Sequence, residues 1–178
     1  MRTLVAFLWL SLTLVFPCES AWCADAGPLV ISVPEGFEGP TRSDEGGGLT
    51  FVWVKRRPAS DGGTLLQVSA IDLGASLDAI TPPQRAEAAK HYLLEFAKGI
   101  GQRLGDFKFG DVEQATLAGS PAARGRWTGV VGGNPAIGVL YCVLVGHWVV
   151  SLHTQDIGPD ITPAMYSAIG AIEGVRVR

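Results

Sequence analysis

Three side chains that could take part in acid–base or metal chemistry lie at alternate positions near the C-terminal end of the sequence. His147, Ser151 and His153 share a parity, and side chains of one parity point to the same face of an extended strand. Asp156 follows just beyond them. Such a set could form a weak metal site or acid–base site. A histidine alone is neither a ligand set nor a triad, so the pattern also fits a polar edge on an otherwise covered strand.

A second polar pattern lies earlier in the sequence. Arg124, Arg126 and Thr128 alternate along a segment that we expect to be extended, so they form the polar face of one strand. Arginines in that position could bind an anionic ligand, or they could simply face solvent. We therefore predict a ligand or partner surface at Arg124, Arg126, His147 and His153.

The sequence lacks the motifs of the common enzyme classes. It contains no Gly-x-Ser-x-Gly segment for a serine nucleophile, and Gly46–Gly48 lacks the lysine and the following helix of a phosphate-binding loop. None of the three histidines has a second ligand at a spacing typical of zinc. Trp53, Trp127 and Trp148 could line a pocket, although core packing is the usual role of aromatic residues on strands. We expect no catalytic residue, no cofactor and no metal, and a binding protein rather than an enzyme.

Two helices and several short strands must position these residues. Residues 139–145 contain no charged side chain, which predicts a central strand buried on both faces. Connections between strands are short and rich in turn residues, as in hairpins. The order of elements predicts an α+β domain with a largely antiparallel sheet and helices packed on it. The expected strands cover residues 29–33, 49–55, 64–72, 111–117, 122–131, 137–145 and 148–154.

The longer helix is expected over residues 83–104. Thr81 and Gln84 have the spacing of a capping box, and the prolines between them fit a first helical turn. Apolar residues recur at helical spacing, which predicts one buried stripe: Ala86, Ala89, Leu93, Phe96, Ile100 and Leu104. A second helix should begin at Pro163 with Thr162 as its cap.

Residues 1–26 have the pattern of a cleaved secretory signal peptide. One basic residue precedes an apolar run over Leu4–Phe16, and Ala24-Asp25-Ala26 fits a signal peptidase site. Residues 27–178 would then form a single periplasmic or extracellular domain with no stable membrane span. A cut after Ala21 is the alternative, and it would retain Cys23, which could pair with Cys142 in an oxidising compartment.

Charge excludes one class of partner. The chain of 178 residues has a formal net charge of −3, and its one basic run is Lys55-Arg56-Arg57. A nucleic-acid-binding protein normally has a basic stripe or patch. We therefore expect no nucleic-acid partner, and interpret the basic run as the solvated end of a hairpin.

The order of elements resembles that of the PsbP-like superfamily over most of the chain beyond the signal segment. The resemblance lies in Val33-Pro34 near the start, the helix over 83–104, and Leu117-Ala118-Gly119-Ser120-Pro121-Ala122 before a three-strand meander and a last helix. It implies a PsbP-like fold and a role as a non-enzymatic binding module or assembly factor, as in exported bacterial members of unknown role. No residue pattern maps onto a particular partner surface of that superfamily.

Two functions remain open at the level of sequence. The chain could be an exported module that presents a sheet face or loop rim to a protein or envelope component. Alternatively, it could be a small-ligand carrier or weak hydrolase with a pocket between sheet and helix. A deep polar cavity near His153 and Arg126 would favour the second function.

Overall fold

A large antiparallel sheet forms the centre of the molecule in the computed structural model, which describes residues 22–45, 47–58, 62–77, 79–158 and 160–178. Its strands lie in the order β3-β4-β5-β10-β9-β8-β6, and β7 also pairs with β8. Their bounds are β3 (Glu38–Glu45), β4 (Gly48–Arg56), β5 (Gly63–Asp72), β6 (Gly105–Phe109), β7 (Glu113–Leu117), β8 (Ser120–Val131), β9 (Asn134–Val145) and β10 (Trp148–Ile157).

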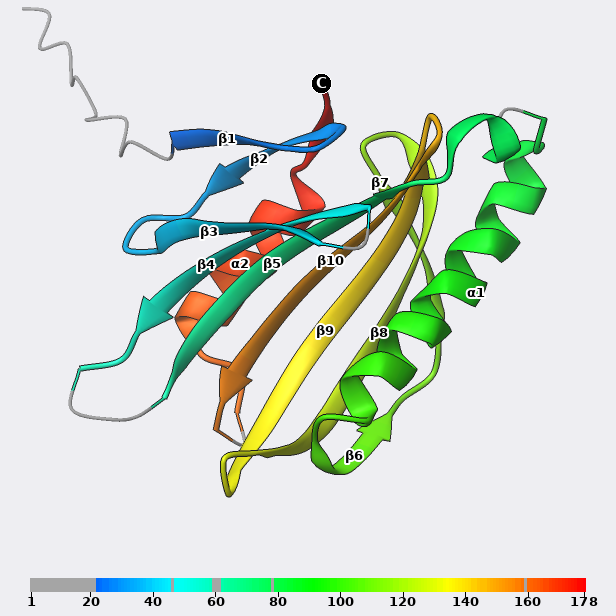
Figure 1. Cartoon of the computed structure of the whole chain (residues 1–178). Helices are drawn as coiled ribbons and strands as arrows, with labels where there is room; N and C mark the ends of the chain where they lie inside the picture. The colour runs from blue at the N-terminus through cyan, green and yellow to red at the C-terminus, as the bar shows by residue number, and fades with distance from the viewer. Residues whose placement is uncertain (1–21, 46, 59–61, 78, 159) are drawn as a thin grey trace, which may run out of the picture.

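Different elements cover the two faces of this sheet (Figure 1). One face packs against helix α2 (Pro163–Glu173) and a three-stranded sheet of β1 (Trp22–Ala26), β2 (Leu29–Val33) and β11 (Arg176–Val177). The other face carries helix α1 (Pro82–Gly101), which packs on β8 and β9 and barely reaches β10. As a result, the half of that face formed by β4 and β5 has no helix above it. The predicted α+β fold with a largely antiparallel sheet is therefore confirmed.

The hydrophobic core has one part on each face of the sheet, and β9 contributes to both. All residues from Val139 to Val145 are buried, which confirms the central strand expected from the absence of charge. Trp53, Val143 and Met165 belong to the larger part under α2, whereas Leu93 and Cys142 belong to the smaller part under α1. Trp53 and Trp127 are core residues as expected.

Helix α1 begins at Pro82, one residue before the predicted start, and ends at Gly101, three residues before the predicted end. Thr81 and Gln84 form the capping box, with the Thr81 amide donating to the Gln84 side chain at 2.8 Å. At the other end, Gly101 lies against Phe107 so closely that an added Cβ would be 2.7 Å from the Phe107 ring. The chain turns back at this point to begin β6, so the predicted extension to Leu104 is wrong.

Strands β1, β3, β6 and β11 were not predicted from the sequence. Strand β3 lies between the expected strands over 29–33 and 49–55; it is an exposed edge strand, so it shows no alternation of buried and exposed residues. Strand β1 falls inside the predicted signal segment, yet Ala24 and Ala26 are buried and the strand pairs with β2 along its whole length. Most of the predicted signal segment lies outside the described residues. None of the described helices is long and apolar enough to cross a membrane.

The two cysteines in the described part of the chain do not form the disulfide considered above. Cys23 is exposed on β1, while Cys142 is buried on β9 among the residues under α1. Both are free thiols. Burial raises the pKa of the Cys142 thiol to about 12. The fold is thus stabilised by its core and its sheet hydrogen bonds without a cross-link between these positions.

Candidate functional site

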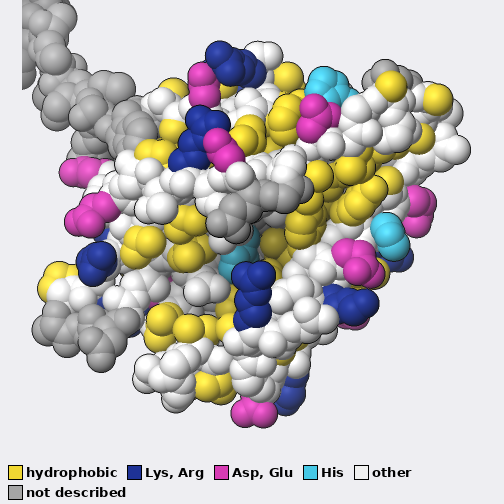
Figure 2. Space-filling model, in the orientation of Figure 1, with side chains coloured by type: hydrophobic (Ala, Val, Ile, Leu, Met, Phe, Trp, Pro, Cys, Tyr) yellow, Lys and Arg dark blue, Asp and Glu magenta, His cyan; other side chains and the backbone are white. Residues whose placement is uncertain are grey.

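A groove lies where α1 stops covering the sheet. Its volume is about 320 Å³, at the small end of the range for small-molecule sites. Figure 2 shows this face hollowed near its middle, with hydrophobic side chains along the helix side. We call it the α1 groove; its lining residues are Gln67, Ser69, Glu95, Phe96, Gly99, Ile100, Arg103, Leu104, Leu140, Ser151, His153 and Gln155.

Uncharged polar side chains from β5 and β10 form the floor of the α1 groove. The antiparallel register places Gln67 opposite His153 and Ser69 opposite Ser151, so four polar side chains lie side by side across two strands. The Gln67 side-chain amide donates to Ser69 Oγ at 3.0 Å. This row has a polar surface because no helix covers it, whereas the β9 residues beneath α1 are apolar.

Residues at the C-terminal end of α1, together with Leu104 in the turn that follows it, form the apolar wall. Phe96, Ile100 and Leu104 belong to the stripe that the sequence predicted to be buried, but they are only partly buried and line the groove. Ala89, Leu93 and Ala97 are buried in the core, and Phe96 and Ile100 pack against its edge. The predicted stripe therefore divides into a core part and a groove part.

Gly99 leaves an opening in this wall. A Cβ added at this helical position would meet no atom within 4 Å. Gly101, in contrast, is required by its contact with Phe107. A glycine inside a helix costs up to about 1 kcal/mol relative to alanine, and packing within the chain does not explain this cost at Gly99.

His153 is held in one orientation by a tryptophan from a strand two places away. Trp127 Nε1 on β8 donates a hydrogen bond to His153 Nε2 at 3.1 Å, and the two rings lie 5.7 Å apart between centroids. Trp127 can lie across β9 because Gly138 is beneath it; a Cβ there would be 2.2 Å from the indole ring. Glycine at 138 thus permits the contact between β8 and β10.

Burial determines the protonation state of the imidazole, and the contact with Trp127 determines its tautomer. His153 is 7% exposed, and burial lowers its pKa to about 4. Since Nε2 accepts the indole hydrogen, the neutral ring carries its proton on Nδ1. Within the described part of the chain, Nδ1 has no protein partner. His153 therefore offers an N–H donor to the groove and has no free lone pair to act as a base.

The four predicted site residues do not come together. His147 lies in the turn before β10 and is 3.5 Å from an Asp72 carboxylate oxygen. Arg124 and Arg126 lie on the opposite face of the sheet from Trp127 and His153, because side chains alternate along β8. Of the predicted residues, only His153 lines the α1 groove, together with its neighbour Ser151.

The two arginines differ from each other in their contacts. The Arg124 guanidinium donates to Glu113 Oε2 at 2.7 Å and lies 3.6 Å from Glu173 Oε1. Tyr141 donates to the same Glu173 oxygen, and burial raises the pKa of Tyr141 to about 12. Arg126 is exposed and makes no ion pair with any described residue. Arg124 is thus neutralised by carboxylates. Arg126 lies on the opposite face of the sheet from His153, so these two described side chains do not line one cavity.

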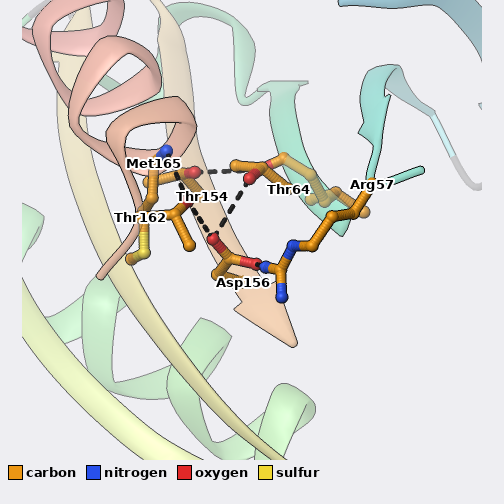
Figure 3. A network of polar contacts seen from close by, with 7 residues as sticks. Arg57, Thr64, Thr154, Asp156, Thr162 and Met165 are labelled. Atoms are coloured by element: carbon orange, nitrogen blue, oxygen red, sulfur yellow. Dashed lines mark hydrogen bonds and ion pairs between the residues drawn. The ribbon is translucent and has the colours of Figure 1, made fainter. Parts of the chain in front are cut away.

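Asp156 belongs to a separate buried network on the α2 side of the sheet (Figure 3). Its carboxylate is fully buried, accepts a hydrogen bond from Arg57 at 2.6 Å, and accepts the hydroxyl hydrogens of Thr64 and Thr162. Thr162 Oγ1 in turn accepts the amide hydrogen of Met165 in the first turn of α2. The network therefore joins α2 to β5 and β10, and Arg57 is not simply a solvated residue at the end of a hairpin.

A larger hollow of about 510 Å³ lies beside the β7–β8 turn. Its lining is made of small side chains such as Ala115, Thr116 and Pro121, and it includes no charged or aromatic residue. A site that orients a ligand needs a few convergent polar groups beside its apolar lining. The α1 groove has both, so it is the better candidate although it is smaller.

Comparison with known proteins gives the fold and little beyond it. No family model and no curated protein matches the sequence. The structure resembles that of LpqN from Mycobacterium tuberculosis, a protein involved in cell envelope biogenesis, with 19% identity, coverage of 84% of this chain and 82% of that chain, and a TM-score of 0.54. It also resembles cyanobacterial PsbP from Synechocystis, with 11% identity, coverage of 85% and 87%, and a TM-score of 0.53. The chain therefore has a PsbP-like fold, as the order of its elements indicated.

Proposed function

We propose that this chain is an exported, non-catalytic binding module and that the α1 groove is its binding site. The observation that supports this most strongly is the state of His153. A general base needs a free lone pair within reach of the proton that it removes. The Nε2 lone pair of His153 is occupied by the Trp127 N–H, and Nδ1 already carries a proton.

The lining of the groove is suited to binding. An apolar wall beside a few convergent hydrogen-bonding groups is the usual composition of a ligand site. Here the wall comes from the end of α1 and the turn after it, and the polar groups come from two interior strands of the sheet. Interior strands are held on both sides by neighbours, so the polar groups have fixed positions before a ligand arrives.

The helical position of Gly99 also fits a binding role. Its cost to the helix has no explanation in the packing of the chain, since nothing lies within 4 Å of an added Cβ. A bound molecule that occupies this space would account for the absence of a side chain. The groove would then be shaped for its occupant rather than for the stability of the free protein.

Export is supported by the pattern of residues 1–26 and by the PsbP-like fold. LpqN, with the same fold, is involved in cell envelope biogenesis. We therefore place the function of this chain outside the cytoplasm and its occupant among the components of the cell envelope. A weak hydrolase is disfavoured, because His153 and Ser151 have no third group beside them in the lining and burial lowers the pKa of His153 to about 4, which makes it a poor base at neutral pH.

The test compares three proteins exposed to an extract of the native envelope. These are the wild type, Gly99→Leu, whose side chain would fill the groove, and Gly170→Leu, the same change in α2 at another site where an added Cβ meets nothing within 4 Å. Mass spectrometry of the washed proteins should find a molecule retained by the wild type and by Gly170→Leu but lost from Gly99→Leu. Equal retention by all three proteins would contradict the proposal and would indicate a different surface.

A further inference from the structure

The floor of the α1 groove carries no formal charge. Gln67 and Gln155 are carboxamides, and Ser69 and Ser151 are hydroxyls, so each of them can both donate and accept a hydrogen bond. His153 adds a neutral N–H donor, as shown above. An occupant that rests on this floor meets hydrogen-bonding groups only.

The charged groups of the groove lie on α1 and in the turn that follows it, and they have opposite charges. Glu95 and Arg103 line the groove, and both are exposed residues. One is negative and the other positive, so together they give neither an anion nor a cation a net advantage. Their exposure also means that water screens them strongly. The groove thus lacks a buried counter-charge for an ionic occupant.

The apolar wall faces this uncharged floor. Phe96, Ile100 and Leu104 are partly buried, and Leu140 is fully buried at the boundary between wall and floor. An occupant that covers the wall removes apolar surface from water, which is favourable in proportion to area. The occupant should therefore have an apolar body as well as a polar group.

We infer that the α1 groove binds a small uncharged ligand, with its apolar body against the α1 wall and a carbonyl or other oxygen acceptor on the Nδ1–H of His153. This inference rests on the proposed function, since it names the ligand chemistry of the same site. Moving an ionised group from water to a site without a counter-charge is costly, whereas a neutral amide can replace its hydrogen bonds to water with those of the floor. A volume of about 320 Å³ limits the ligand to a small molecule or one small part of a larger one.

Three probes with one apolar skeleton test the charge selection. They are 4-phenylbutanamide, 4-phenylbutanoate and 4-phenylbutylammonium, titrated at neutral pH into the purified protein while amide resonances are followed by NMR. We expect the amide to bind at least about tenfold more tightly than either ion. The amide chemical shifts that change on binding should belong to residues of β5, β10 and the end of α1. These changes should be absent in Gly99→Leu and present in Gly170→Leu.

The outcomes separate this inference from the proposed function. Tighter binding of an ionic probe in the groove would overturn the inference and leave the groove as a binding site. Failure of the amide to bind up to its solubility limit would also overturn the inference, while the envelope experiment would still test the site itself. Binding of the amide with equal shifts in wild type and Gly99→Leu would show that the probe binds elsewhere, which also contradicts the inference.

Discussion

Replacing Gly99 by leucine should make the protein more stable and prevent binding. The site lies near the end of α1 beside an open space, and an added Cβ there meets no atom within 4 Å. Leucine favours a helix interior over glycine by up to about 1 kcal/mol, and we expect about half of that so close to the helix end. A gain of about 0.5 kcal/mol corresponds to a rise in Tm of about 1–2 °C for a domain of this size.

The same leucine places an isobutyl group in a groove of about 320 Å³. Stability and binding should therefore change in opposite directions, which excludes misfolding as the cause of lost binding. Gly170→Leu provides the matched control, because it makes the same substitution near the end of α2, on the other face of the sheet. It should gain similar stability and keep its occupant.

Chemical denaturation and retention of the envelope molecule would be measured on all three proteins. A decrease in the unfolding free energy of Gly99→Leu would refute the reasoning, because it would mean that the space beside Gly99 is closed in solution. Normal stability with full retention of the occupant would also refute it, since the occupant would then lie outside the groove.

Four further results are expected. Burial lowers the pKa of His153 to about 4, so His153 stays neutral in the native protein at pH values where it is protonated in the unfolded chain, that is, below about pH 6.5. The unfolding free energy should therefore fall as the pH decreases from about 6.5 to 4, and urea titrations should show a shallower fall in His153→Gln. An equal pH dependence of the unfolding free energy in the two proteins would contradict the burial of this histidine. Ala118 has a φ of +51°, so Ala118→Asn should stabilise the β7–β8 turn by about 0.5–1 kcal/mol in the same assay, and a loss of stability would argue against that backbone conformation. Asp156→Ala should cost about 3 kcal/mol, because it removes the shared acceptor of a buried network, and a change below about 1 kcal/mol would show that the network adds little. The exported protein should retain Trp22–Ala26, which forms β1, so intact mass should place the signal cut before this segment, and a mature chain starting at Gly27 would contradict this.

Much of the fold could be predicted because its strongest signals are local. Residues 139–145 lack charge and form the central strand, and Thr162 followed by Pro163 marks the start of α2. The elements that were missed have weaker signals. Strand β3 is an exposed edge, so it lacks the alternation that indicates burial. Strand β1 does alternate, with Ala24 and Ala26 buried, but it lies in a segment with the composition of a signal peptide.

The candidate site was predicted only in part. The shared parity of Ser151 and His153 correctly placed them on one face, and parity also separates Asp156 from them. The sequence could not show that Trp127 reaches His153, since that contact depends on strand order and on Gly138 between them. It also could not show which part of the α1 stripe reaches the core, because this depends on how far the helix extends across the sheet.

The central claim is that the occupant of this protein lies in the α1 groove. A crystal structure of the protein with the molecule that it retains from the native envelope tests this most directly. We predict an uncharged part of that molecule between Phe96 and His153, with an oxygen within hydrogen-bond distance of His153 Nδ1. A molecule bound beside the β7–β8 turn, or on the face that carries Arg126, would contradict the claim.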